Sequence, residues 1–242
     1  MKNINGISQV QEVIFTKGGA KNKYDTTSKS YHLIMGVFEI KPNTEALKMA
    51  DIRPGEEVLD VAFGTGWVLE KLVLLVDKAT YVHGIDFSLG MHQETQKRLR
   101  NTHFWDRVML IQGNVLCMPY KSQSFDVLFA SFIIDIQSCR DIQHFLSECK
   151  RVLRPHGRLV LVAMTKEGEG IQKFARCFYD WFYPFWPTIF GYRASSRPIY
   201  VKQEVARAGF SVIKEKFTYI TFFHIPIHII LCTPMEKEIS GD

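Results

Sequence analysis

The stretch Val58–Leu72, VLDVAFGTGWVLEKL, places two glycines between a short apolar run and a segment with helical spacing. Glycine weakens strands and helices, so the pair indicates either a sharp turn or a backbone that lies against a ligand. The run before it is continuously apolar, which is typical of a strand buried on both faces, and Val68, Leu69 and Leu72 follow at helical spacing. The stretch therefore predicts a strand, a tight turn and a helix.

The same alternation continues along the chain. Further strands are expected at TYVHGID, RVMLIQG, SFDVLFASFII and GRLVLVAMT. Helices are expected at SLGMHQETQKRLRN, with Ser88 as the N-cap, and at CRDIQHFLSECKRVLRP, which Pro155 should end. A helix around YVKQEVARAG and two strand-like runs, FSVIKEKFTY and TFFHIPIHIILC, follow. Strands that alternate with helices predict an α/β fold with a parallel sheet and helices on both faces.

Bulk properties narrow the class of protein. The chain has 242 residues and a net charge of +5 without a concentrated basic stripe, which argues against a nucleic-acid partner. Mildly basic character is compatible with contact to an anionic membrane surface. Five cysteines form no metal-binding pattern, so we expect reduced thiols and no metal site. The start of the sequence has no apolar signal region, and we expect a cytoplasmic protein, with membrane association left open.

An acidic residue after the second expected strand points to a nucleoside-containing ligand. Asp86 follows Gly64 by 22 residues, where a carboxylate can accept hydrogen bonds from both hydroxyls of a ribose. NAD and S-adenosylmethionine share this feature. The dinucleotide fingerprint needs a third small residue where this chain has Leu69, which argues against a pyrophosphate. Asn114 and Val115, after the third strand, are placed to meet the edge of a purine.

At this point the sequence resembles class I S-adenosylmethionine-dependent methyltransferases. The segments VLDVAFGTGW, GIDFS, GNVLCMPYKSQSFDVL and ECKRVLRPHGRLVLV match their four sequence blocks in order and spacing, over about residues 55–165. The subgroup resembles quinone-biosynthesis C-methyltransferases and soluble phospholipid N-methyltransferases. YDTTSKSYHLIMG and SRPIYVKQEVARAGFSV resemble their flanking segments more loosely. The resemblance implies a Rossmann-like, seven-stranded, mostly parallel, doubly wound sheet with an antiparallel last strand.

The resemblance also implies S-adenosyl-L-methionine as cofactor and a role for individual residues. Asp60, Gly64 and Gly66 would line the methionine moiety, and Asp86 would hold the ribose. The full set expected at the cofactor is Tyr24, Tyr31, Asp60, Ala62, Phe63, Gly64, Thr65, Gly66, Asp86, Phe87, Ser88, Met91, Asn114, Val115 and Ser131. Two positions depart from the family pattern: Ala62-Phe63 replaces the commoner Gly-Cys pair, and Asn114 stands where Asp is common.

Most of these residues also have a purely structural reading. Asp60 could cap the following helix, and Asp86 could be a turn residue. Tyr24 and Tyr31 could be core aromatics, and Ser131 could be a cap. These alternatives stay open on the sequence alone.

Methyl transfer from a sulfonium requires alignment of the acceptor and exclusion of water, and a base only for some acceptors. Asp135, after the fourth strand, is the candidate base, although it could instead cap the next helix. His32 and His144 are weaker candidates, whereas His224 and His228 fit an alternating strand pattern as ordinary sheet residues.

The acceptor region is expected in an aromatic-rich segment. Residues 174–192, FARCFYDWFYPFWPTIFGY, hold ten aromatic side chains, which suit an apolar or planar small molecule, a lipid head group, a membrane surface or a homodimer contact. We therefore expect one domain: an N-terminal lid or acceptor segment (1–50), a cofactor-binding core (51–165), an acceptor insertion (166–198) and a final helix with strands (199–242).

Two other classes of function remain as alternatives. One is an NAD-dependent oxidoreductase, and the other is a non-catalytic family member that binds the cofactor as a scaffold or partner subunit. The expected activity is transfer of a methyl group to an apolar or aromatic acceptor such as a quinone precursor or a lipid head group.

Overall fold

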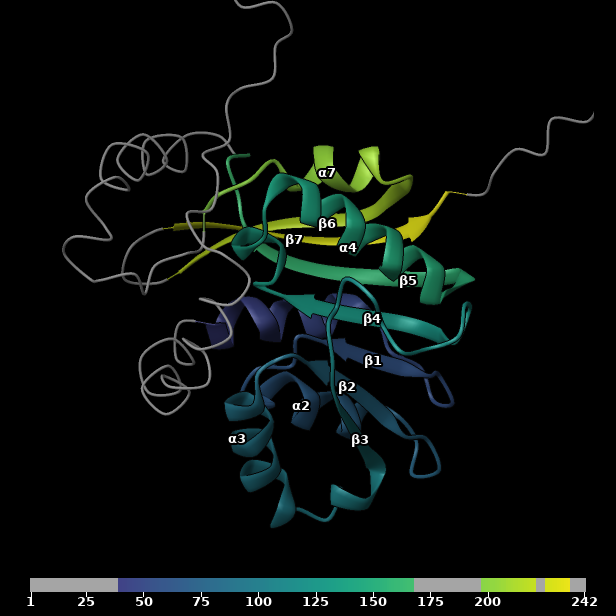
Figure 1. The fold of residues 1–242 in the computed structure, drawn as a ribbon. Helices are drawn as coiled ribbons and strands as arrows, with labels where there is room; N and C mark the ends of the chain where they lie inside the picture. The colour runs from purple at the N-terminus through teal and green to yellow at the C-terminus, as the bar shows by residue number, and fades with distance from the viewer. Residues whose placement is uncertain (1–38, 168–196, 221–224, 236–242) are drawn as a thin grey trace, which may run out of the picture.

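Seven strands form one sheet in the computed structural model, which describes residues 39–167, 197–220 and 225–235 (Figure 1). The order across the sheet is β3-β2-β1-β4-β5-β7-β6. The strands are β1 (Val58–Val61), β2 (Val82–Asp86), β3 (Val108–Gln112), β4 (Phe125–Ser131), β5 (Leu153–Met164), β6 (Phe210–Ile220) and β7 (Ile225–Pro234).

The strand directions confirm the predicted fold class. Neighbouring strands from β3 to β5 pair in parallel, while β7 runs antiparallel to both β5 and β6. The chain passes outward from β1 to β2 and β3, and then returns to place β4 on the other side of β1. The gap between β1 and β4 is therefore the point where strand order reverses, and ligands of open α/β sheets bind at such points.

Helices cover both faces of the sheet. A helix over residues 39–50, α2 (Trp67–Leu75) and the end of α3 (Leu89–Arg100) pack on one face with Val58, Phe129 and Val160. On the opposite face α4 (Cys139–Val152) and α7 (Val201–Arg207) pack on Leu59 and Leu128. Neighbouring residues of β1 and β4 thus belong to different cores, as expected for strands buried on both sides.

Two boundaries differ from the sequence prediction. The fourth strand ends at Ser131 and is followed by a short 3₁₀ helix, η2 (Ile134–Ile136), although its apolar run continues. The helix before β5 ends at Val152, three residues before Pro155, and β5 already begins at Leu153. Proline disfavours helical backbone at the preceding residue, so the helix ends early and the ladder shifts register opposite Phe125.

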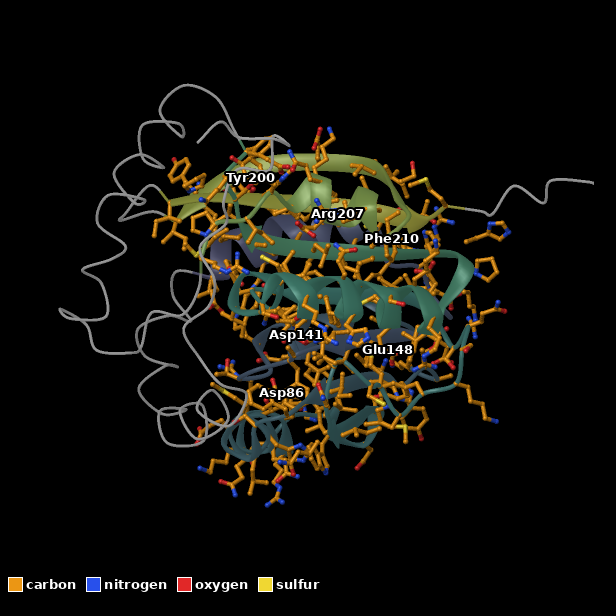
Figure 2. All side chains as sticks on the ribbon, turned by 45° about the horizontal axis from the view of Figure 1, so that its top comes forward. Asp86, Asp141, Glu148, Tyr200, Arg207 and Phe210 are labelled. Atoms are coloured by element: carbon orange, nitrogen blue, oxygen red, sulfur yellow. The ribbon has the colours of Figure 1, made fainter. Side chains whose placement is uncertain are left out.

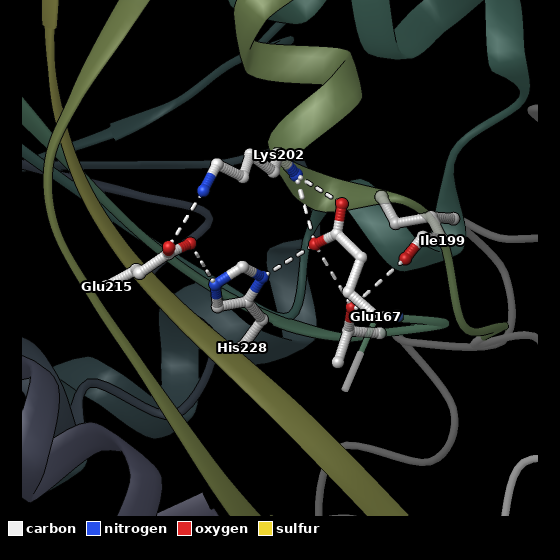
Figure 3. Close-up of polar contacts among 6 residues, drawn as sticks. Glu167, Ile199, Lys202, Glu215 and His228 are labelled. Carbon is white, nitrogen blue, oxygen red and sulfur yellow. Dashed lines mark hydrogen bonds and ion pairs between the residues drawn. The ribbon is translucent and has the colours of Figure 1, made fainter. Parts of the chain in front are cut away.

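One buried histidine anchors the antiparallel part of the sheet. His228 of β7 is fully buried, with Nδ1 2.7 Å from Glu167 Oε2 and Nε2 3.1 Å from Glu215 Oε2 (Figure 3). The ring stacks on Phe217, with ring centroids 4.1 Å apart. Lys202 completes the cluster, since its Nζ donates to Glu215 and its backbone N–H to Glu167. His228 thus joins the end of β5 to β6, a structural role compatible with the predicted ordinary sheet residue. His224 lies outside the described residues.

This cluster makes a testable prediction for stability. His228→Leu removes both ring nitrogens at similar volume and leaves Glu167 and Glu215 each without one partner, so we expect a loss of about 2 kcal/mol in the free energy of unfolding. The matched control is Lys202→Met, which removes an exposed ion pair and should cost less than about 1 kcal/mol. Urea denaturation measures both values. Equal losses for the two variants would contradict the proposed anchoring role.

Candidate functional site

The turn between β1 and α2 is built from left-handed backbone. Ala62, Gly64 and Gly66 have φ angles of 61°, 53° and 75°. A Cβ on Gly66 would lie 2.6 Å from Thr95 Cγ2, whereas a Cβ on Gly64 would meet nothing nearer than the Ala62 carbonyl oxygen at 4.0 Å. Gly66 is therefore required by packing against α3, while Gly64 borders open space. Gly66 thus fits the reading of a tight turn, and the space beside Gly64 is compatible with the ligand reading.

Asp86 holds this turn against the end of β2. Its carboxylate accepts a hydrogen bond from the Gly64 N–H at 2.9 Å and another from the Ser88 N–H at 2.9 Å. The side of the turn next to α3 is fixed as well, since Thr95 donates to the Gly64 carbonyl and Arg98 to the Thr65 carbonyl. Asp86 is 4% exposed and lies at the carboxyl end of its strand (Figure 2).

Asp60 is a second buried acid beside this turn. It is 2% exposed, and its Oδ2 has no hydrogen-bond partner in the described part of the chain. Burial, reinforced by the negative charge of Asp86, raises the pKa of Asp60 well above its usual range. A buried carboxylate oxygen without a partner is costly, and a cationic or hydrogen-bond-donating ligand would satisfy it. No helix-capping contact of Asp60 is present, because the N-cap of α2 is Gly66.

A cavity opens over these residues at the carboxyl ends of β1, β2 and β4. It encloses about 780 Å³ of space between atoms, part of which is open to solvent. The lining residues are Glu39, Asn43, Asp60, Ala62, Phe63, Gly64, Thr65, Trp67, Val68, Asp86, Phe87, Met91, Ser131, Phe132, Ile133 and Ile136. These described residues include three carboxylates and no lysine, arginine or histidine. The cavity is therefore an acidic site.

Most of the predicted cofactor residues meet in this cavity. Nine of them line it: Asp60, Ala62, Phe63, Gly64, Thr65, Asp86, Phe87, Met91 and Ser131. Gly66 and Ser88 do not line the cavity but belong to the turns that border it. The Ser88 side chain caps α3 by accepting a hydrogen bond from the Met91 N–H at 3.2 Å. Tyr24 and Tyr31 lie outside the described residues, as do His32 and the aromatic run.

The structure does not bring Asn114 and Val115 to the cavity. Asn114 Oδ1 accepts from the Leu116 N–H at 3.0 Å and so closes a local turn, while Val115 packs into the core under α4. Glu39 and Asn43, which the sequence motifs did not identify, reach the cavity from the helix over residues 39–50. No local sequence pattern marks either residue, because their helix meets the cavity only in the folded chain.

Asp135 is brought close to the cavity without lining it. Ile133 and Ile136 face the cavity, and Asp135 between them is fully buried and accepts from the Met164 N–H at 3.3 Å. Burial raises its pKa to about 7, partly offset by this hydrogen bond and by the charge of Arg197. The other candidate base, His144, is exposed on α4.

Comparison with known proteins identifies the family. The model of the ubiE/COQ5 methyltransferase family matches residues 8–204, which is most of the chain.

This chain belongs to the ubiE/COQ5 methyltransferase family.

Its curated relatives include the ubiquinone/menaquinone biosynthesis C-methyltransferase UbiE of Hahella chejuensis, 28% identical over 148 residues that cover 59% of this chain and 58% of that protein. The demethylmenaquinone methyltransferase of Thermotoga maritima is 28% identical over 183 residues, or 73% of this chain and 74% of the relative. This chain thus spans little more than half of the length of the Hahella protein.

Solved structures confirm the fold. A chain of the complex between the Haloferax volcanii Trm112 methyltransferase activator and a methyltransferase superposes with a TM-score of 0.71 at 13% identity, covering 90% of this chain and 98% of that one. The [4+2]-cyclase SpnF superposes with a TM-score of 0.62 at 16% identity, covering 81% of each chain. These two proteins carry different activities, so the shared fold does not by itself specify the reaction. Among the helices in the described part of the chain, none is both long and apolar enough to cross a membrane.

The two glycines make separable predictions. Gly66→Ala should lower the free energy of unfolding by more than about 2 kcal/mol, because its Cβ collides with Thr95 in left-handed backbone. Gly64→Ala should cost about 1 kcal/mol, since it has only the backbone penalty. Thermal or urea unfolding of both variants checks the order. A larger loss for Gly64→Ala would mean that the space above this residue is filled by protein.

Asp135 makes a prediction for pH dependence. Its raised folded-state pKa means that the unfolded chain releases the proton first, so its contribution to stability is complete below about pH 4 and is lost as pH rises toward about 7. Asp135→Asn does not titrate, so the variant should not lose stability at this position as the pH rises. The difference in unfolding free energy between variant and wild type should therefore grow in favour of the variant between pH 4 and pH 7, by on the order of 4 kcal/mol. Parallel pH profiles would contradict a raised pKa.

Proposed function

We propose that this chain binds S-adenosyl-L-methionine in the acidic cavity and transfers its methyl group to a small aromatic acceptor of the quinol class. The observation that supports this most directly is the unpartnered oxygen of buried Asp60 beside the open space above Gly64. Curated relatives named as quinone-biosynthesis methyltransferases support the acceptor class.

The charge of the cavity favours this cofactor over a dinucleotide. S-adenosylmethionine carries a positive sulfur and an ammonium group, and the carboxylates of Glu39, Asp60 and Asp86 suit both. A nicotinamide dinucleotide carries a negative pyrophosphate, which would face three carboxylates and no cationic side chain among the lining residues that the structure describes. Leu69, which is fully buried in the core behind the turn, also fills the place of the third small residue. Both features argue against the oxidoreductase alternative.

The residues of this chain would position the ligand as follows. Asp86, at the end of β2, would accept hydrogen bonds from the ribose hydroxyls. Gly64 would leave space for the amino-acid portion of the cofactor. Asp60 would accept a hydrogen bond from the ammonium group. When bound, the cofactor supplies a methyl group on a positive sulfur that is already activated for transfer. The protein then has to align the acceptor and exclude water.

Calorimetry with S-adenosylhomocysteine tests the cofactor assignment. Wild-type protein should bind it and should not bind NADH. Asp60→Asn should weaken binding by about 10-fold or more, because it removes a charge-assisted hydrogen bond, and Asp86→Ala should abolish measurable binding. The matched control is Asp106→Asn, an exposed acid on the 3₁₀ helix at Trp105–Arg107, which should leave affinity unchanged.

Because Asp86 also holds the turn, unfolding of Asp86→Ala must be measured beside binding. A folded Asp86→Ala protein with wild-type affinity would refute the site. Binding of NADH instead of S-adenosylhomocysteine would support the oxidoreductase alternative.

The acceptor is tested separately, by methyl transfer from labelled S-adenosylmethionine to 1,4-dihydroxynaphthalene carrying a prenyl chain. We expect a C-methylated product from the quinol and none from phosphatidylethanolamine. Methyl transfer to the amine of phosphatidylethanolamine would instead show that the acceptor is a lipid head group. Cofactor binding without transfer to either acceptor would favour the non-catalytic alternative.

A further inference from the structure

Asn43 joins the first described helix to the end of β4 inside the cavity. It is 4% exposed, it lines the cavity, and its Oδ1 accepts a hydrogen bond from the Ser131 hydroxyl at 2.6 Å. The two residues are 88 positions apart in the sequence, so the pair depends on the folded structure. Ser131 is the last residue of β4, at the point where strand order reverses. The amide therefore lies where ligands of such sheets bind.

The contact with Ser131 also orients the amide group. An asparagine amide has one acceptor oxygen and one NH₂ donor group, and the hydrogen-bond network decides which is which. Because Oδ1 is engaged by the Ser131 hydroxyl, Nδ2 carries the two remaining donor hydrogens. No acceptor for Nδ2 is present among the residues that the structure describes. The Asn43 residue is more than nine-tenths buried at the edge of the cavity, and a ligand there could supply an acceptor for Nδ2.

Among the described residues that line the cavity, no side chain is cationic. Its charged lining residues, Glu39, Asp60 and Asp86, are all acids, which suit the positive parts of a ligand. A ligand that also carries a carboxylate must place it against N–H donors. Asn43 supplies the one side-chain amide among the lining residues that lie in the described part of the chain. It is thus suited to accept the negative end of a ligand with mixed charge.

The strand order places this amide opposite the ribose end of the proposed site. Asp86 ends β2, the Gly64 turn follows β1, and Ser131 ends β4, in the spatial sequence β2-β1-β4. Neighbouring strands lie about 4.8 Å apart, so the two ends are separated by roughly 10 Å. A ligand with its ribose at Asp86 and its chain across Gly64 would bring its far end toward Asn43.

We propose that Asn43, oriented by Ser131, binds the carboxylate of the methionine portion of the cofactor and thereby selects adenosyl ligands with an intact amino acid. This assignment rests on the proposed function and identifies a subsite within it. Asn43 is the ligand-binding residue, and Ser131 is a positioning residue that fixes the amide.

The test compares S-adenosylhomocysteine with 5′-methylthioadenosine by calorimetry. Both contain adenosine and a thioether, and only the first carries the amino acid. Asn43→Ala should lower the affinity for S-adenosylhomocysteine by about 10- to 100-fold, which is the range for a hydrogen bond to a charged group. The affinity for 5′-methylthioadenosine should change by less than about 2-fold. Asn43→Asp should lower the affinity for S-adenosylhomocysteine further, because the carboxylate of the ligand would then face a second carboxylate. Ser131→Ala should give a smaller loss, since the amide remains but can rotate.

Lys48→Ala, on an exposed position of the same helix, is the matched control and should leave both affinities unchanged. Equal weakening of both ligands in Asn43→Ala would overturn the proposal and make Asn43 a residue that shapes the cavity. Unchanged S-adenosylhomocysteine affinity with a raised KM for the quinol would overturn it in favour of an acceptor contact. If wild-type protein binds neither ligand, the proposed function itself fails, which is a separate result from either of these.

Discussion

The hydrogen bond from the Gly64 N–H to the Asp86 carboxylate links the two halves of the candidate site. It fixes a left-handed turn after β1 to the tip of β2, and the same carboxylate also accepts from Ser88 at the start of α3. Because the turn is tied on its outer side to Thr95 and Arg98, its backbone has little freedom, and the space above Gly64 stays open. A preorganised cavity reduces the ordering cost of binding, which is the physical advantage of holding a glycine turn so firmly.

This arrangement places two acids side by side in a buried environment. Burial, and after it the negative charge of Asp86, raises the pKa of Asp60, so Asp60 holds its proton more tightly than a free carboxyl group. Such an arrangement is unfavourable in an empty site and favourable once a cationic ligand arrives. The proposed cationic ligand would therefore complete the electrostatics of the cavity, and the proposed role of the Asn43 amide extends the same reasoning to a negative group.

The sequence was sufficient for features that depend on local pattern. Buried strands gave continuous apolar runs, and the strand–turn–helix unit at Gly64 and Gly66 identified the edge of the sheet at which the cavity lies. It could not identify Asn43, because the contact to Ser131 joins segments 88 residues apart and no local pattern encodes it. Asn114 shows the reverse case: its place after β3 suggested a purine contact, whereas its side chain is engaged by the N–H two residues on, a competition that short polar side chains commonly enter.

The position of Asp135 illustrates how local geometry separates proximity from contact. A 3₁₀ helix repeats every three residues, so Ile133 and Ile136 share the face that lines the cavity, and Asp135 is turned toward the backbone of Met164. A base acting on an acceptor must lie within hydrogen-bond reach of the proton that it removes. For Asp135 to serve in this way, η2 would have to rotate or the acceptor would have to enter between η2 and β5. Methyl transfer from a sulfonium can proceed with alignment alone, so a cavity that supplies charge complementarity without an exposed base is compatible with the chemistry proposed for it.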